Sequence, residues 1–255
     1  MKPCGDKLAA IMDTIEVNLH RLRQRIDAAS AAWDRAPGSV RLLAVSKTQP
    51  AAAVRAACDA GQLAFGENYV QEALAKIEAL ADLRAGLEWH LIGPLQSNKT
   101  RAVAAAFDWV QSVDRFKIAE RLAAQRPPEL PPLQICLQVN ISGEASKSGL
   151  LPDELPTVAQ AVAALPRERL RLRGLMAIPE PAADFEAQRA PHRALRELFE
   201  RLNEAGLGLD TLSMGMSGDL IAAIAEGATM VRVGTAIFGS RAPVAPLAPV
   251  APLPA

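Results

Sequence analysis

One lysine gives the first indication of chemistry in this sequence. Lys47 follows the apolar run Leu42 to Val45, which predicts a buried strand, and Pro50 is typical of the start of the next helix. Burying a charged ammonium is costly, so a lysine at such a place is usually ion-paired, held neutral or used covalently. Covalent use would make Lys47 a nucleophile for an aldehyde. The alternative is a lysine whose ammonium reaches solvent at the strand end.

Small and hydroxyl residues follow the last two predicted strands, and an arginine accompanies them. Hydroxyls and unobstructed backbone N–H groups at the start of a helix are suited to binding phosphate. The alternative is that the glycines only serve tight turns. Two separate clusters, one after each of the last two predicted strands, favour phosphate binding. The proposed phosphate-binding residues are Ser213, Gly215, Ser217, Gly234 and Thr235, with Arg232 as a nearby cation.

Apolar runs and amphipathic stretches alternate along most of the chain, which predicts parallel strands joined by helices. Helices are expected to start near Ala51, Val70, Lys99, Phe116, Asp153, Asp184 and Ser217, and an extra N-terminal helix is expected over Asp6 to Ala32. The predicted strands are Leu42 to Val45, Leu63 to Phe65, Trp89 to Ile92, Trp109 to Ser112, Leu133 to Asn140, Leu172 to Ala177, Thr211 to Ser213 and Met230 to Val233.

This alternation predicts an α/β fold, a single (β/α)8 barrel of the TIM type. Polar residues follow many of the strand ends, the face on which such barrels build their sites, whereas an open doubly wound sheet would gather them at one switch point. The open sheet is the second possibility. We expect residues 1–241 to form the barrel domain and residues 242–255, rich in Pro and Ala, to form a disordered tail.

Composition excludes several other classes of function. The 28 basic and 28 acidic residues balance, so net charge gives no bulk attraction to nucleic acid or to an acidic membrane surface, and nucleic-acid binding is disfavoured. Three scattered cysteines suggest neither a disulfide framework nor a metal site. No apolar run is long enough to span a membrane. We therefore expect a cytoplasmic protein with no bound metal.

Six motifs in order along the chain resemble the pyridoxal phosphate homeostasis proteins, relatives of the alanine racemase barrel that lack its C-terminal β domain (fold type III). The resemblance covers about Asp6 to Arg241. The motifs are Leu43-Ala-Val-Ser-Lys47, Phe65-Gly-Glu-Asn-Tyr-Val-Gln-Glu72, Trp89-His-Leu-Ile-Gly-Pro-Leu-Gln-Ser-Asn-Lys99, Asn140-Ile-Ser-Gly-Glu-Ala-Ser-Lys-Ser-Gly149, Arg173-Gly-Leu-Met-Ala-Ile-Pro179 and Leu212-Ser-Met-Gly-Met-Ser217. One departure is Gly218, where the family usually carries an acidic residue.

The resemblance implies a cofactor, pyridoxal 5'-phosphate (PLP), held as a Schiff base on Lys47. It implies that the two late clusters hold the phosphate and that Arg232 faces the pyridine nitrogen. A cation there keeps the ring unprotonated and weakens PLP as an electron sink. The alternative for Arg232 is an ion pair with a neighbouring carboxylate.

Other residues receive weaker assignments. Asn68 is expected either to hydrogen-bond the phenolic oxygen of PLP or to cap the next helix, and Lys147 either to be a solvated loop residue or to guide PLP exchange as a secondary contact. His90 is expected to make a structural hydrogen bond, with a place in the pocket lining as the alternative, and His20 and His192 are expected to lie at the surface.

Three functions compete. The first is a monomeric, non-enzymatic PLP carrier and homeostasis factor with no catalytic residues, whose partners are PLP and PLP-dependent apo-enzymes. The racemase relatives need a tyrosine base from an additional domain, whereas the only tyrosine here is Tyr69. The second is a PLP-dependent amino-acid racemase or lyase. The third is a barrel enzyme for another phosphorylated metabolite, with Lys47 in an ion pair.

Overall fold

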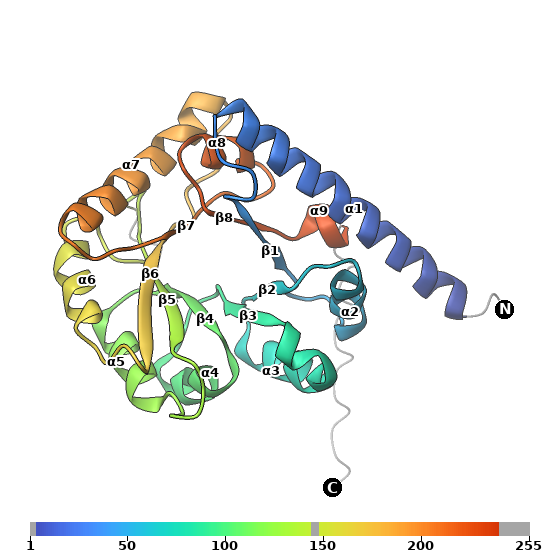
Figure 1. The fold of residues 1–255 in the computed structure, drawn as a ribbon, viewed down its shortest axis with the longest axis horizontal. Coiled ribbons are helices and arrows are strands. Elements are labelled where there is room, and N and C mark those ends of the chain that lie inside the picture. Colours follow the sequence, from blue (N-terminus) through green and yellow to red (C-terminus); the bar gives the residue numbers. More distant parts are fainter. Residues whose placement is uncertain (1–3, 144–147, 240–255) are drawn as a thin grey trace, which may run out of the picture.

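Eight parallel strands close into a barrel in the order of the sequence (Figure 1). The computed structural model describes residues 4–143 and 148–239, with side chains from Thr14 onward. The predicted (β/α)8 barrel is confirmed and the open sheet is excluded. The strands are β1 (Arg41–Val45), β2 (Ala64–Glu67), β3 (Glu88–Leu91), β4 (Trp109–Val113), β5 (Leu133–Gln138), β6 (Leu170–Met176), β7 (Thr211–Ser213) and β8 (Met230–Val233).

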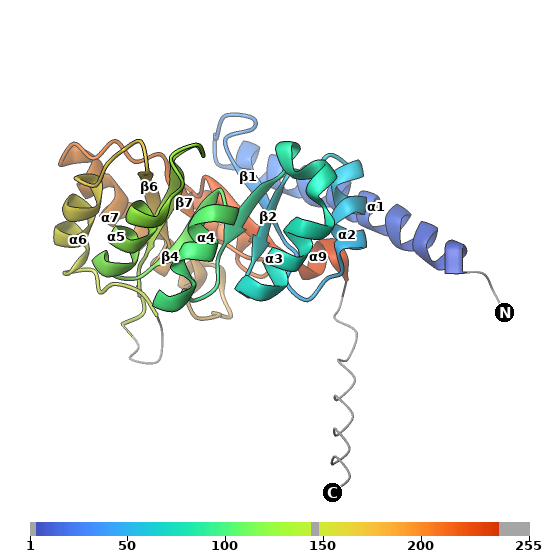
Figure 2. The same cartoon turned by 90° about the horizontal axis from the view of Figure 1, so that it is seen from below.

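Helices surround the strands and cover their outer faces (Figure 2). Most begin within a few residues of the expected positions, although the segment from Ser217 forms a turn before its helix starts at Leu220. The short helices η1, η2 and α9 were not expected. The helices are α1 (Cys4–Ala32), α2 (Ala51–Asp59), α3 (Val70–Ala79), η1 (Ala81–Gly86), η2 (Ser97–Lys99), α4 (Thr100–Ala106), α5 (Phe116–Gln125), α6 (Leu155–Ala163), α7 (Phe185–Glu204), α8 (Leu220–Ala225) and α9 (Thr235–Phe238).

The expected N-terminal helix α1 packs beside the last helices of the barrel. Its apolar stripe, which includes Leu19 and Ile26, is buried. Asn18 donates a hydrogen bond to the carbonyl of Ile237, and Arg35, just after α1, donates to carbonyls at the end of α8 and beyond it. The first helix is therefore tied to the segments that carry the two late clusters.

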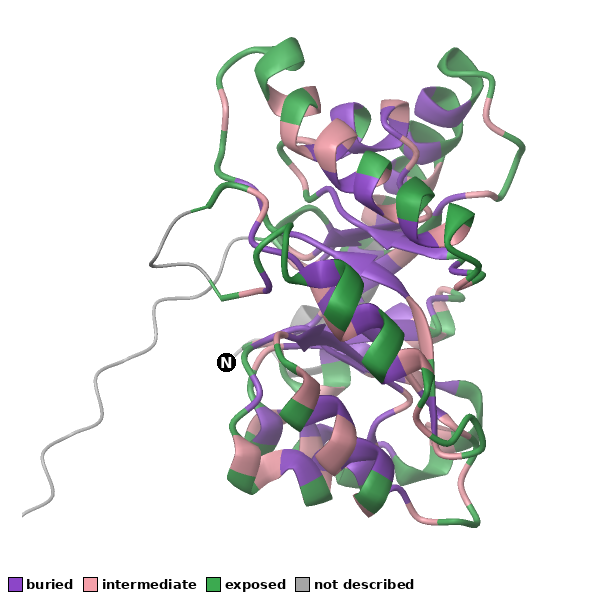
Figure 3. Cartoon of the chain, turned by 90° about the vertical axis from the view of Figure 1, so that its left-hand side faces the viewer, coloured by how far each residue is buried: buried purple, intermediate pink, exposed green. Residues whose placement is uncertain are grey.

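The core has two parts of different character. Between strands and helices it is apolar, as in the contact of Phe65 with Trp89, whose ring centroids lie 5.8 Å apart. Inside the barrel, fully buried polar side chains such as His90 and Gln111 accompany apolar ones. Figure 3 shows the buried strands at the centre and the exposed residues on the outer helices. The barrel interior is therefore a place where polar side chains interact without solvent.

Two expectations lie outside this description. The proposed domain boundary at residue 241 and the tail 242–255 are not in the described ranges.

Within the described ranges, no helix combines the length and apolar character needed to cross a bilayer. No group of three or more His, Cys, Asp or Glu side chains in these ranges could hold a metal ion.

Candidate functional site

A cavity of about 260 Å³ opens where β1 and β8 end and where the loop after β7 begins. Five of the predicted site residues line it, together with the apolar Val45 and Met216 and with Gln49, Gly218 and Gly239. These five are Lys47, Ser217, Arg232, Gly234 and Thr235. The fold therefore brings an amine, a guanidinium, hydroxyls and glycine turns from distant parts of the sequence to one place.

The backbone on both sides of Lys47 is fixed by side chains from α3. Lys76 Nζ donates to the carbonyl oxygen of Ser46 at 2.6 Å, and the backbone N–H of Thr48 donates to Glu72. Thr48 has a φ of +63°, in the left-handed region that a threonine rarely adopts. The lysine backbone therefore turns sharply at the strand end and is held there.

A buried carboxylate completes this group of side chains. Glu67 Oε1 lies 2.7 Å from Lys76 Nζ and accepts a hydrogen bond from the Ser46 hydroxyl at 2.6 Å. Burial raises the pKa of Glu67, while the ammonium of Lys76 acts in the opposite direction. We call Glu67, Glu72 and Lys76 the clamp, because together they hold the backbone at Ser46 and Thr48.

Arg232 is almost fully buried at one side of the cavity. Its Nη1 donates to Ser213 Oγ at 2.7 Å and its Nη2 to the carbonyl oxygen of Ala177 at 2.8 Å. No carboxylate accepts a hydrogen bond from it within the described ranges, so the ion-pair alternative is not what the structure shows. Burial lowers the pKa of Arg232 to about 10, against the opposing charge of Asp219.

Two predicted glycines permit close approaches of the backbone: Gly234 lines the cavity, whereas Gly215, in the loop after β7, is not part of its lining. A β-carbon at Gly234 would lie 2.8 Å from the carbonyl oxygen of Val45, and one at Gly215 would lie 2.5 Å from the β-carbon of Ala223. Gly215 also has a φ of +90°. Side chains at these positions would displace the loops after β7 and β8, so the absence of a side chain shapes the cavity.

The other predicted residues lie at different places. Ser213 is fully buried, and its hydroxyl contacts Arg232 and Gln111 rather than lining the cavity. Asn68 follows β2, and its Oδ1 is a buried oxygen without a hydrogen-bond partner in the part of the chain that is described. It makes no side-chain cap to α3. Lys147 lies outside the described residues.

The turn between β7 and α8 depends on a histidine that was wrongly expected at the surface. His192 in α7 is buried, and its Nε2 lies 3.0 Å from Asp219 Oδ2, while Oδ1 of Asp219 accepts from the backbone N–H of Met216. The helical periodicity of α7 placed His192 near its apolar face, which was the missed signal. At Gly218 the chain departs from the family pattern, and a β-carbon built there would meet no atom within 4 Å. The hydrogen bond from Met216 to Asp219 that closes this turn forms with the glycine in place.

Some residues with important contacts were not identified from the sequence. The sequence assigns no role to Glu72 and Lys76, because one sequence does not show which charges of a helix face a strand end. Gln111 gave a clearer signal, since it is a polar residue inside the apolar strand Trp109–Val113. His90, by contrast, makes the structural hydrogen bonds expected of it, to Glu88 and Gln111.

The chemistry of the cavity suits a small molecule with an aldehyde and an anionic group. Lys47 supplies an amine, Arg232 supplies a buried cation, and the glycine turns with Ser217 and Thr235 supply space and hydrogen-bond donors. Among the described residues, the lining contains no carboxylate, imidazole, thiol or phenol that could serve as a second base.

Comparisons with known proteins identify relatives of this chain. The sequence model of the family described as alanine racemase, N-terminal domain, matches residues 17–242. A pyridoxal phosphate homeostasis protein of Pseudomonas aeruginosa is 63% identical over 230 residues, which are 90% of this chain and 97% of that protein. A protein of the same name from Escherichia coli K12 is 54% identical over 231 residues, covering 90% of this chain and 98% of the relative.

A solved structure resembles the fold described above. PipY of Synechococcus elongatus, solved with PLP bound, superposes with a TM-score of 0.76 at 40% identity. The match covers 88% of this chain and the whole of PipY.

Proposed function

The chain belongs to the alanine racemase N-terminal domain family and, within it, to the pyridoxal phosphate homeostasis proteins, and from this premise we propose that it binds PLP as a Schiff base on Lys47 and exchanges it. The observation that carries the proposal is that Lys47 and Arg232 line one cavity together with the glycine turns after β7 and β8. The PLP-bound relative has the same fold over nearly the full chain.

The predicted site residues, of which Lys47, Ser217, Arg232, Gly234 and Thr235 line the cavity, fit the parts of PLP. Lys47 would carry the aldehyde carbon, Gly215, Ser217, Gly234 and Thr235 would hold the phosphate, and Arg232 would face the pyridine nitrogen. Asn68 does not line the cavity, and its contact with the phenolic group stays a prediction. Ser213 acts through Arg232, whose guanidinium it holds. Bound PLP supplies a reactive imine carbon and an electron-withdrawing ring.

We propose that the protein carries PLP rather than catalysing amino-acid chemistry with it. Arg232 is a cation with a pKa of about 10, so beside the ring nitrogen it would donate a hydrogen bond rather than give up a proton. No second base lines the cavity among the described residues, whereas racemisation needs one on each face of the substrate. Transfer to PLP-dependent apo-enzymes, an exchange role for Lys147 and a monomeric state stay predictions.

One experiment tests the covalent bond. Protein reconstituted with PLP is expected to show the absorbance band of a protonated Schiff base, and borohydride reduction followed by peptide mapping is expected to find PLP on Lys47. Lys47→Ala is expected to lose the band and the labelled peptide, whereas Lys117→Ala, at an exposed position of α5, keeps both. Labelling of a different lysine would contradict the assignment.

A second measurement separates the carrier from an enzyme. The loaded protein is incubated with L-alanine and other L-amino acids, and the D-isomer and keto-acid products are quantified. We expect no appreciable turnover. Multiple turnovers that disappear in Lys47→Ala would show that the racemase or lyase alternative is right.

A further inference from the structure

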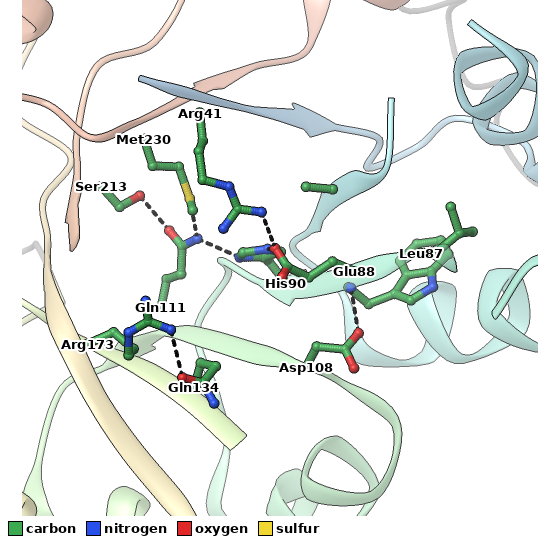
Figure 4. A network of polar contacts seen from close by, with 12 residues as sticks. Arg41, Leu87, Glu88, His90, Asp108, Gln111, Gln134, Arg173, Ser213 and Met230 are labelled. Carbon is green, nitrogen blue, oxygen red and sulfur yellow. Dashed lines mark hydrogen bonds and ion pairs between the residues drawn. The ribbon is translucent and has the colours of Figure 1, made fainter. Parts of the chain in front are cut away.

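A line of hydrogen bonds crosses the barrel interior from Arg232 to the opposite mouth of the barrel. Figure 4 shows its part from Ser213 through Gln111 and His90 to Glu88. Arg232 donates to Ser213, and the Ser213 hydroxyl donates to Gln111 Oε1 at 2.6 Å. Gln111 Nε2 lies 2.8 Å from His90 Nδ1. His90 Nε2 lies 2.7 Å from Glu88 Oε1. These residues come from β8, β7, β4 and β3, so the line exists only in the closed barrel.

Only one arrangement of protons satisfies every member of this line. Arg41 donates to Glu88 at 2.8 Å, so Glu88 is a carboxylate acceptor and His90 donates to it from Nε2. His90 Nδ1 then accepts from the amide nitrogen of Gln111. The amide oxygen of Gln111 consequently faces Ser213 and takes its proton. The Ser213 oxygen is left to accept from the guanidinium.

Because these side chains are buried, each of their polar groups depends on its partner within the line. His90, Gln111 and Ser213 are each 0% exposed, and Arg232 is 3% exposed. Water therefore does not satisfy a group whose partner has turned away. The second amide hydrogen of Gln111 points toward the sulfur of Met230 at 3.1 Å, which offers only a weak acceptor.

The charged groups around His90 come from several strands. Glu88 shares its strand, Arg41 reaches it from β1, and Asp108 lies just before β4. Its ring stacks on Trp109 with centroids 5.2 Å apart, and Arg173 from β6 covers that indole. Burial lowers the pKa of His90 despite the hydrogen bond to Glu88, so its neutral form is favoured.

We propose that His90 and Gln111 are positioning residues for Arg232. A neutral His90 fixes the amide of Gln111, the amide fixes the Ser213 hydroxyl, and the hydroxyl oxygen receives the guanidinium. With the amide reversed, the Ser213 oxygen would accept from both Gln111 and Arg232, and the serine proton would lose its acceptor inside the barrel. The serine hydroxyl would then no longer be held in one orientation, and the guanidinium would keep only the Ala177 carbonyl as a fixed acceptor. The effect on PLP rests on the proposed function of Arg232.

The first test uses the protein without PLP, so its result does not depend on the proposed function. Nitrogen NMR of ring-labelled histidine distinguishes Nδ1–H from Nε2–H, and the chain has only three histidines, of which His20 is an exposed reference. We expect His90 to be neutral at pH 7 with the proton on Nε2. In Gln111→Glu, a carboxylate faces Nδ1, and we expect that nitrogen to become protonated. A proton on Nδ1 of His90 in the wild type would overturn the proposal.

The second test measures the effect on PLP. Gln111→Met keeps the approximate size of the side chain but removes the acceptor for Ser213, and we expect the Kd of PLP to rise about tenfold. Gln134→Met is the matched control, because Gln134 in β5 contacts Arg173 and the Pro132 carbonyl but not the line from Arg232. We expect the Kd of this control to stay within about twofold of the wild type.

A double-mutant cycle completes the test. If Gln111 acts through Arg232, then Gln111→Met adds little to the loss caused by Arg232→Gln. Equal effects of Gln111→Met and Gln134→Met, or full additivity with Arg232→Gln, would overturn the proposal. Failure of the wild type to bind PLP would instead overturn the proposed function, and the NMR measurement would still decide whether the line of hydrogen bonds exists.

Discussion

At the level of single residues, backbone space matters as much as side-chain chemistry around Lys47. Gly234 passes the carbonyl of Val45 so closely that a β-carbon would lie 2.8 Å from its oxygen. The same glycine follows Arg232 by two positions, so a shift there moves both the cation and the turn that would hold the phosphate. The site is therefore sensitive to the smallest side chain.

This sensitivity gives a prediction for Gly234→Ala. The added methyl group pushes β8 away from β1, and we expect PLP binding to weaken at least about tenfold, with about 1–3 kcal/mol lost from the free energy of unfolding. Titration of the Schiff-base band and urea denaturation measure the two effects. Gly86→Ala is the control, since a β-carbon there meets no atom within 4 Å. Equal behaviour of the two variants would contradict this account of Gly234.

The buried His90 predicts a dependence of stability on pH. Its pKa in the folded protein lies below the ordinary value of 6.5, so the unfolded chain takes up a proton that the folded protein refuses. This contribution to stability is complete above pH 6.5 and is lost as the pH falls below it toward the folded pKa. The expected slope is at most about 1.4 kcal/mol per pH unit.

Denaturation of the PLP-free protein between pH 7 and pH 5 measures this slope. Glu67 acts in the opposite direction, because burial raises its pKa and its contribution falls as the pH rises. The comparison of wild type with His90→Gln therefore isolates the histidine. We expect the variant to lose less stability than the wild type over this range, and a parallel decline of both proteins would refute the prediction.

Helix α3 fixes the end of strand β1 through the clamp. Lys76 is almost fully buried and contacts two carboxylates and one carbonyl, so removing its charge leaves Glu67 buried without a cation. The arrangement links the local geometry at Lys47 to the packing of a helix that starts more than twenty residues later in the chain.

We expect Lys76→Met to lower the free energy of unfolding by about 3–5 kcal/mol, the usual cost of breaking a buried ion pair. Adding Glu67→Gln to this variant removes the unpaired charge and is expected to restore part of the loss. Lys117→Met, which breaks an exposed pair with Glu120, should cost about 0–1 kcal/mol. Urea denaturation compares the variants, and similar losses for Lys76→Met and Lys117→Met would show that the clamp does not stabilise the fold.

The elements of the fold were predictable because apolar runs such as Leu42 to Val45 lie between clear helix signals. The contacts between elements were not. Glu67 lies in one of the six motifs, but the sequence does not show that it forms a buried ion pair with Lys76. Long-range contacts such as Arg35 with the carbonyl of Ala228 depend on the closed barrel, and a single sequence carries no signal for them. The cluster of Lys47, Arg232 and the late loops followed from the family resemblance and from the rule that barrel sites form at strand ends.

The whole molecule should become more stable when PLP binds, because the cavity joins the first strand to the last. PLP that binds only the folded chain raises the free energy of unfolding by about 2.7 kcal/mol at one hundred times its Kd. Thermal denaturation with and without PLP measures this gain. We expect Lys47→Ala to lose most of it, and an equal gain in that variant would argue against the bond at Lys47.

The polar filling of the barrel has a consequence for engineering. Aliphatic side chains in place of His90, Gln111, Ser213 and Arg232 would relieve the desolvation of a buried cation, and such repacking often makes a protein more heat-resistant. It would also erase the orientation that these groups give to one another. A screen for thermotolerance alone would therefore tend to select variants that unfold at a higher temperature and no longer bind PLP.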